Sequence, residues 1–110
     1  MLAPSQRIGH SRDFSTAVRQ GRRVRRGNLV AHIAPSQQAT RCGFIVSKAV
    51  GNSVIRHRVT RRLRALCREQ YAKLPAGSIV VLRALPGAAT ASYGALREDL
   101  QRITDSMAAR

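Results

Sequence analysis

The 110-residue chain is predicted to fold as one α+β domain in which helices pack against a single sheet. Two observations support this fold class. The hydrophobic pattern changes period along the chain in the order helix, two or three strands, helix, strand, helix, which is αβββαβα when three strands form. In addition, 44% of the residues are apolar, which suffices for one modest core but not for two domains.

The N-terminal part is predicted to contain an arm, a short helix and a first strand. Residues 1–10 include proline and glycine and are predicted to form an extended arm. A helix follows over 11–20, with Ser11 as its N-cap and Gly21 at its end. The basic residues Arg23–Arg25 then form a short strand.

Two further strands are predicted before the middle of the chain. Residues 29–33 alternate between two apolar faces, and the turn at 35–38 follows. The next strand is predicted over 41–48, with Phe44 and Val46 on the same face.

The stretch from Ser53 to Lys73 predicts a long amphipathic helix capped by Asn52 or Ser53. At about 100° per residue, its apolar residues form one stripe. These residues are Ile55, Val59, Leu63, Leu66, Cys67 and Leu74. The opposite side is charged or polar and carries His57, Arg61, Arg64 and Arg68. One side is therefore expected to pack on the core and the other to face a ligand or solvent.

The C-terminal part predicts one strand and one helix. Ile79–Ala84 is the strongest strand signal, and a Pro-Gly pair ends it. After a Ser92 cap, apolar residues recur at spacings of three and four as far as Met107, which is typical of an amphipathic helix.

Charge is concentrated in one region of the chain. The sequence has 20 Lys and Arg against five Asp and Glu, a formal net charge of +15. No acidic residue occurs between Asp13 and Glu69, whereas thirteen cations do, and only Lys48 among them is a lysine. Such a block repels itself unless a polyanion neutralises it, and arginine suits bidentate phosphate contacts. The charge block is therefore expected to bind nucleic acid. The alternatives, a solvated face without a partner and a membrane-binding surface, are disfavoured.

A protein active site is not predicted. His10, His32 and His57 are scattered over the arm, a strand and the helix, and the acidic residues lie outside the basic segment. His32, expected on a sheet face beside the arginine helix, is kept as a candidate nucleic-acid contact. Phe14 suits core packing and base stacking about equally.

The two cysteines are predicted to be buried free thiols. Cys42 and Cys67 are isolated, with neither C-x-x-C spacing nor a histidine placed to complete a metal site. No apolar run is long enough for a membrane span or a signal peptide, so a cytoplasmic protein is expected.

The segment 43–68 contains a distinctive motif made of Ser47-Lys48, Gly51-Asn52, Val54, Arg56-His57-Arg58, Arg61 and Arg64. Through this motif the segment strongly resembles the protein component of bacterial ribonuclease P. Weaker matches are Ser11, Asp13-Phe14 and Gly21 at one end and the strand and helix over 79–107 at the other.

The resemblance implies a fold and an activity. The fold is a single ribonuclease P protein domain over 1–110, of the ribosomal protein S5 domain 2 type, with a mixed sheet and a left-handed βαβ crossover around the arginine helix. The implied activity is that of a ribonucleoprotein endonuclease, a hydrolase in which the RNA subunit cleaves precursor tRNA at its 5′ end. No cofactor and no catalytic residue of the protein are then expected, and Mg²⁺ is expected with the RNA. Sulfate or phosphate is expected to bind the basic face of the isolated protein.

The resemblance also implies two sets of binding residues. The set expected to bind the ribonuclease P RNA comprises Lys48, Asn52, Arg56, Arg58, Arg61, Arg62, Arg64 and Arg68. The set expected to line a cleft for the single-stranded 5′ leader of precursor tRNA comprises Phe14, Val30, His32, Ile45 and Ser47. Relatives often have a lysine where Thr60 stands, and Arg62 is expected to offset that lost charge.

Two alternatives share the basic helix. A ribosomal or other structural RNA-binding protein has the same charge and fold type but no role in cleavage. A DNA-binding module is disfavoured, because no neighbouring helix stands at helix-turn-helix spacing.

Overall fold

The computed structural model describes Arg7 and residues 11–108. Three α-helices, four strands and two short 3-10 helices occur in these residues, in the predicted αβββαβα order. They are α1 (Ser11–Gln20), β1 (Arg22–Arg26), β2 (Leu29–Pro35), β3 (Arg41–Ile45), α2 (Ser53–Gln70), η2 (Tyr71–Lys73), β4 (Ser78–Ala84), η3 (Pro86–Ala89) and α3 (Tyr93–Ala108).

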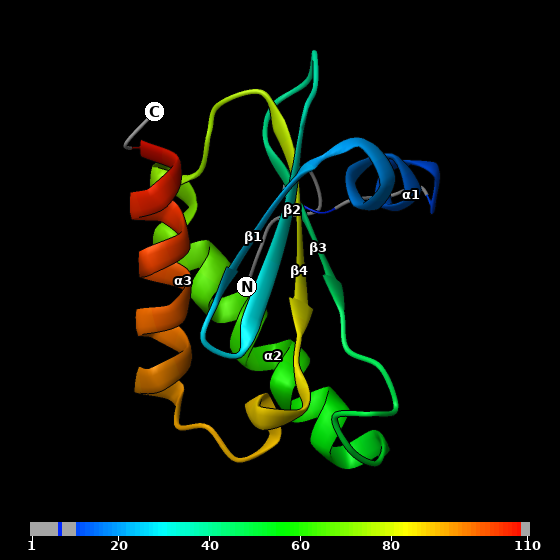
Figure 1. Cartoon of the computed structure of the whole chain (residues 1–110), viewed down its shortest axis with the longest axis vertical. Helices are drawn as coiled ribbons and strands as arrows, with labels where there is room; N and C mark the ends of the chain where they lie inside the picture. Colours follow the sequence, from blue (N-terminus) through cyan, green and yellow to red (C-terminus); the bar gives the residue numbers. More distant parts are fainter. Residues whose placement is uncertain (1–6, 8–10, 109–110) are drawn as a thin grey trace.

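The four strands form one mixed sheet in the order β1-β2-β4-β3. β2 pairs antiparallel with both β1 and β4, whereas β3 and β4 are parallel and α2 connects them. Helices α2 and α3 cover one face of the sheet, and α1 lies on the other (Figure 1). The predicted α+β sandwich is confirmed, and the hand of the β3–α2–β4 crossover stays an expectation.

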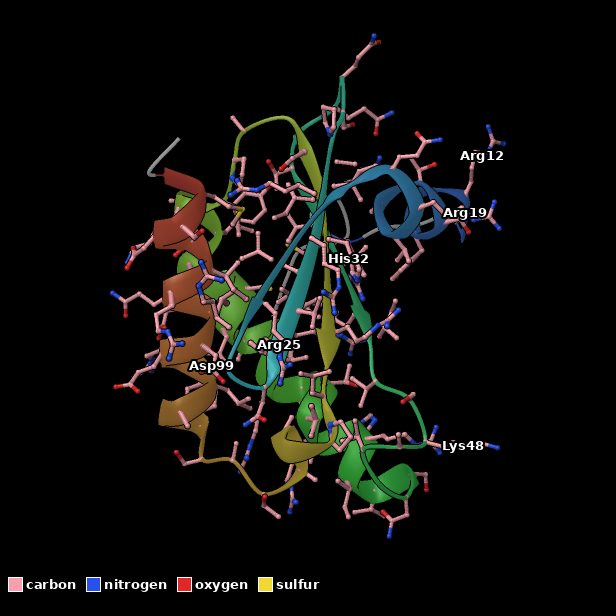
Figure 2. All side chains as sticks on the ribbon, viewed as in Figure 1. Arg12, Arg19, Arg25, His32, Lys48 and Asp99 are labelled. Atoms are coloured by element: carbon pink, nitrogen blue, oxygen red, sulfur yellow. The ribbon has the colours of Figure 1, made fainter. Side chains whose placement is uncertain are left out.

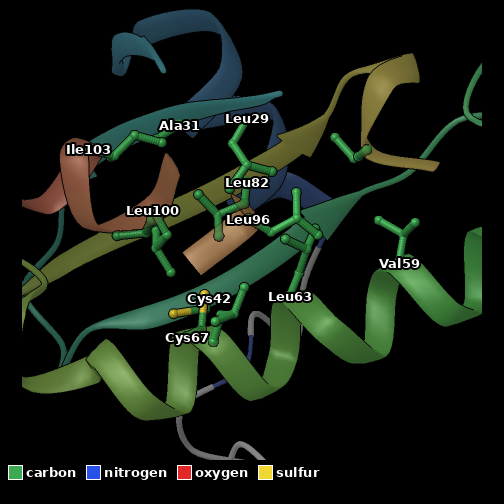
Figure 3. Close-up of a cluster of buried hydrophobic side chains, with 14 of the residues drawn as sticks. Leu29, Ala31, Cys42, Val59, Leu63, Cys67, Leu82, Leu96, Leu100 and Ile103 are labelled. Carbon is green, nitrogen blue, oxygen red and sulfur yellow. The ribbon is translucent and has the colours of Figure 1, made fainter. Parts of the chain in front are cut away.

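The larger core lies between the sheet and helices α2 and α3. Strand residues such as Leu29 and Leu82 meet Leu63 of α2 and Leu100 of α3 there, and all four are fully buried (Figure 3). This burial explains the predicted apolar stripe of α2. Each such leucine contributes about 1.5–3 kcal/mol through removal from water.

The two cysteines lie side by side in this core, Cys42 on β3 and Cys67 on α2 (Figure 3). Both are free thiols and buried, as predicted. A hydrogen bond with Cys42, followed by burial, raises the pKa of Cys67 well above its usual range. Cys67 is therefore a poor nucleophile that fills space in the core.

A smaller core lies under α1 on the opposite face. Ala17 of α1 meets Ala34 of β2 and Val81 of β4, and Phe14 packs against this cluster while half-buried. Since α1 has only ten residues, it covers one end of that face. The rest of the face carries the side chains described below.

Most predicted boundaries are confirmed to within three residues. The strand predicted over 41–48 ends earlier, at Ile45, and the helix predicted over 53–73 becomes a 3-10 turn after Gln70. Asn52 caps α2 through its Oδ1, which accepts a hydrogen bond of 3.0 Å from the Ile55 amide. Ser92 caps α3 in the same way.

Of the arm predicted over 1–10, only Arg7 belongs to the described residues, and it forms a parallel β-bridge with Cys42. Within the described part of the chain, every helix falls short of the length and apolar character needed to cross a bilayer.

Candidate nucleic-acid interface

The basic residues of α2 point in three directions. The buried side of the helix carries Val59, Leu63, Leu66, Cys67 and Gln70, and successive residues are offset by about 100°. The remaining positions form a cleft flank, an outer face and a loop flank. The cleft flank is Arg56, Thr60 and Arg64; the outer face is His57, Arg61 and Arg68; the loop flank is Arg58 and Arg62.

The outer face is open to solvent. His57, Arg61 and Arg68 are all exposed. In the described part of the chain, no arginine of α2 forms an ion pair with a carboxylate, whereas Arg97 and Glu69 do so through two 3.0 Å hydrogen bonds. The cations of α2 are therefore free to meet an external polyanion.

The loop flank binds backbone carbonyl oxygens at the end of η3 and in the loop between η3 and α3. Arg58 donates to the carbonyl oxygen of Ala89 at 3.3 Å, and Arg62 donates to that of Ala91 at 3.2 Å. Each guanidinium has five N–H donors, so both retain donors for a phosphate. The two arginines thus have a structural role that sequence reasoning missed.

The cleft flank faces a hollow of about 150 Å³ at the edge of β3. Phe14 of α1, Arg7 of the N-terminal segment, and Thr60 and Arg64 of α2 line this hollow. The Nε atoms of Arg56 and Arg64 are buried and have no hydrogen-bond partner among the described residues. Phe14, which was expected to line the leader cleft, therefore shares this hollow with the arginine helix.

The expectation that Arg62 offsets the charge missing at Thr60 is wrong. Thr60 lies on the cleft flank, where its hydroxyl donates to the Arg56 carbonyl oxygen at 2.9 Å, whereas Arg62 points toward α3. The cations beside Thr60 in the hollow are Arg7 and Arg64.

The part of the sheet that α1 leaves uncovered is also basic. Strand pairing places Arg23 of β1 beside His32 of β2, and places Arg25 beside Val30. Val30 in turn pairs with Arg83 of β4. Sequence reasoning missed these three arginines. The alternation of side chains along a strand could have revealed Arg83, because it must lie on the same sheet face as Val81, two residues earlier.

His32 forms the floor of this basic face. It is 4% exposed, and neither ring nitrogen has a hydrogen-bond partner among the described residues. Burial, then the nearby charges of Arg83 and Arg23, lower the pKa of His32, so the ring is neutral at pH 7. The expectation that His32 lies beside the arginine helix is wrong, because it lies on the α1 side of the sheet (Figure 2).

The other predicted leader residues differ in exposure. Val30 is 1% exposed and pairs with Arg25 of β1 on one side and Arg83 of β4 on the other. Ile45 also pairs with Arg83. Strand β4 therefore lies between Val30 and Ile45, which separates them by two strand spacings, about 10 Å. Ser47 is exposed beyond the end of β3.

Lys48 and Asn52 lie near the N-terminus of α2. Lys48 was expected at a strand end but occupies the turn after β3, and its exposed side chain extends away from the molecule (Figure 2). The Oδ1 of Asn52 accepts a hydrogen bond in the helix cap, which leaves the side-chain NH₂ group as the donor for a phosphate contact.

The described acidic groups lie on α3 and at the C-terminal end of α2, where Glu69 pairs with Arg97. Of the four acidic side chains that are described, three belong to α3, and Asp99 there accepts a 3.0 Å hydrogen bond from the Asn28 amide. The described residues contain no cluster of three or more His, Cys, Asp or Glu side chains that suits a metal ion.

Comparison with known proteins identifies the family. The family model described as Ribonuclease P matches residues 2–108. The chain belongs to the ribonuclease P protein family. The match extends over nearly the whole sequence, well beyond the arginine helix that first indicated the resemblance.

Curated relatives agree with this assignment. The chain is 50% identical to the ribonuclease P protein component of Streptomyces avermitilis over 110 residues, covering 91% of this chain and 89% of the relative. It is 46% identical to that of a Nocardioides species over 106 residues, covering 93% and 91%. The chain is thus a protein subunit of ribonuclease P, a ribonucleoprotein endoribonuclease of tRNA processing, and its partner is RNA.

Solved structures of the family share the fold. The RNase P protein from Staphylococcus aureus superposes with a TM-score of 0.83 at 20% identity, covering 93% of this chain and 94% of that one. The protein from Thermotoga maritima gives 0.80 at 19% identity, with 89% and 94% covered.

Proposed function

We propose that the protein binds the ribonuclease P RNA through the outer face and loop flank of α2 and binds the 5′ leader of precursor tRNA on the α1 side of the molecule. The observation that carries this proposal is the set of α2 arginines without a carboxylate partner in the described part of the chain. A helix whose cations are not neutralised by carboxylates is suited to phosphates, because each contact releases counterions from the nucleic acid.

The leader-binding surface combines apolar and basic groups. Phe14 and Arg64 line one hollow, where a base stacks on the ring and the guanidinium meets the neighbouring phosphate. The basic sheet face continues from there, with Ile45 and Arg83 in one row and the buried Val30 supporting them. A neutral His32 offers one donor and one acceptor, which suits a base edge or a ribose hydroxyl better than a phosphate.

Bond cleavage is assigned to the RNA subunit. The described residues do not fit a magnesium site, since their carboxylates are dispersed over α2 and α3. Mg²⁺ is therefore proposed to bind to the RNA. The protein contributes positive charge between two RNA molecules, which weakens their repulsion and lowers the Mg²⁺ concentration needed for cleavage.

The same chemistry predicts two accessory properties. Sulfate or phosphate is proposed to bind the basic faces when RNA is absent, because these anions present the same oxygens as a nucleic-acid backbone. Since both RNA partners are made in the bacterial cytoplasm, we place the protein there.

The decisive experiment is reconstitution. The purified chain is added to a bacterial ribonuclease P RNA at low Mg²⁺, and 5′ processing of a precursor tRNA is followed. Stimulation over the RNA alone is expected. No stimulation, at protein concentrations that saturate RNA binding, would contradict the proposal and favour a structural RNA-binding protein.

A further inference from the structure

A second surface on α2 is separate from the leader cleft. Two hollows of about 510 Å³ and 320 Å³ lie along the outer side of the helix and share Arg58 and Arg61. Val54 lines the first hollow and Tyr93 lines the second. Together they form one shallow groove, the α2 groove, with an apolar group at each end and arginines between.

Val54 is the exposed end of the groove. It is 73% exposed, and among the described residues it is the only large hydrophobic side chain that is exposed. A single exposed valine is ordinary on a protein surface. This one, however, lies in a hollow beside His57 and Arg61, where an aliphatic group gains contact only if a ligand brings an apolar surface to it.

Tyr93 is the aromatic end of the groove, and its ring is held in place. The guanidinium of Arg97 lies 5.2 Å from the ring centroid, and Glu69 fixes that guanidinium through two hydrogen bonds. Because Arg58 and Arg62 bind the carbonyl oxygens that precede α3, Tyr93 is positioned next to α2. A preorganised ring beside arginines has the composition of a base-stacking site.

The dimensions of the groove fit a nucleic-acid strand. Val54 and Ala65, which lines the hollow at Tyr93, are eleven residues apart on α2, about 16 Å along the axis. A stacked strand advances about 3.4 Å per nucleotide, so the groove spans about five nucleotides. Duplex RNA hides its base faces, whereas an unpaired segment offers them.

The groove and the leader cleft cannot hold one continuous straight strand. The cleft flank and the loop flank lie on the order of 120–160° apart around the α2 axis. We propose that the α2 groove binds an unpaired segment of the RNA subunit, with bases against Val54 and Tyr93 and phosphates at Arg58 and Arg61. This inference rests on the proposed function.

The test uses the full chain and a bacterial ribonuclease P RNA transcript. Tyr93→Leu and Val54→Ala are each expected to weaken binding to this RNA, about fivefold or more for Tyr93, without changing the salt dependence of binding. Tyr93→Phe keeps the ring and is expected to bind like wild type. Arg61→Ala is expected to lower the salt slope by about one unit.

Several outcomes would overturn the inference. Wild-type affinity in both Tyr93→Leu and Val54→Ala, or an equal loss of affinity for a perfect RNA duplex, excludes base contact in the groove. A loss confined to precursor over mature tRNA would assign these residues to the leader instead. Thermal unfolding shows whether each variant is folded. If Tyr93→Leu is not folded, the affinity of Val54→Ala for the RNA decides whether the inference holds, because the Val54 side chain is exposed and its removal should not disturb the fold.

The failure of this inference is distinguishable from the failure of the proposed function. If wild-type protein neither binds the RNA subunit nor stimulates processing, the proposed function is wrong. If wild type does both and the groove variants match it, only the groove is wrong.

Discussion

His32 differs from a surface histidine in its burial and in the charges that surround it. It is buried on the sheet between Arg23 and Arg83 with both ring nitrogens unpartnered, so protonation would add a third cation to a site without an acid among the described residues. A ligand that supplies hydrogen-bond partners would remove this deficit. The residue therefore connects the stability of the fold with occupation of the surface proposed to bind the leader.

The lowered pKa of His32 predicts a pH dependence of stability. As pH falls below about 6.5, the unfolded chain takes up a proton that the folded chain refuses, until the lower folded pKa is reached. Stability should fall in that window by at most about 1.4 kcal/mol per pH unit from this group. Thermal unfolding from pH 7 to pH 5 measures the effect.

His32→Gln provides the control, because glutamine does not titrate. Its melting temperature should fall less over the same pH range than that of the wild type. Parallel curves for the two proteins would show that other groups cause the acid destabilisation.

Gly27 shows a local constraint in the β1–β2 turn. Its φ of 57° is unfavourable for other residues, and an added Cβ would lie 2.1 Å from the Asp99 Oδ1. Asp99 is buried and binds the Asn28 amide, so moving it breaks a hydrogen bond between the turn and α3. Gly27→Ala is expected to destabilise the fold by about 1–3 kcal/mol in urea unfolding.

The matched substitution is Gly94→Ala in α3. A Cβ there meets nothing closer than 4.0 Å, and alanine is the better helix former. It should be neutral or stabilise by up to about 1 kcal/mol. Equal destabilisation by both substitutions would contradict the role assigned to the turn.

At the scale of the element, α2 carries basic side chains on two separate surfaces, which are proposed to bind different RNAs. Arg61 is exposed on the outer face, whereas Arg64 lines the hollow with Phe14. Arg61→Ala combined with Arg68→Ala, both on the outer face, should weaken binding of the RNA subunit and lower its salt slope by about two units. Affinity measured between 50 and 200 mM salt gives the slope.

A charge-matched control comes from exposed cations elsewhere. Lys73→Ala combined with Arg102→Ala removes the same charge from η2 and α3. Its salt slope should remain at the wild-type value. If both double variants lower the slope alike, net charge rather than the α2 surface controls binding.

The leader surface makes a different prediction for α1. Phe14→Leu keeps an apolar side chain over the smaller core but removes the aromatic ring from the hollow. It should weaken binding of precursor tRNA while leaving mature tRNA unaffected, by about fivefold or more if a base stacks there. Equal changes for the two RNAs would contradict the assignment.

For the whole molecule, charge is segregated between the layers. The sheet face beside α1 and the exposed sides of α2 are basic, whereas the outer helix α3 carries acidic side chains among its basic ones (Figure 2). The net charge of +15 opposes folding until an anion neutralises it. Beyond its first turn, α3 is thus expected to face away from RNA.

This charge predicts stabilisation of the free protein by anions. Sulfate binds the folded state more tightly than the unfolded state, so the melting temperature should rise with sulfate concentration. Sodium chloride at equal ionic strength should raise it less. An identical response to both salts would show screening without specific anion binding.

Much of the functional surface was predictable because it depends on local sequence. The period of 3.6 residues separates the apolar and basic sides of α2, and the Asn52 and Ser92 caps fix the starts of two helices. The block of arginines without acids indicates a polyanionic partner. The motif within 43–68 identified the family that the comparisons confirm.

The sequence by itself therefore determined the elements, the charged helix and the family, since each depends on neighbours within a few turns. Only the tertiary structure decided which face of the sheet α1 covers, and hence that Arg23, His32 and Arg83 share one site away from α2. Strand alternation defines two faces but does not say which helix packs on either. Contacts such as those of Tyr93 with α2 depend on the folded chain path, which no local pattern contains.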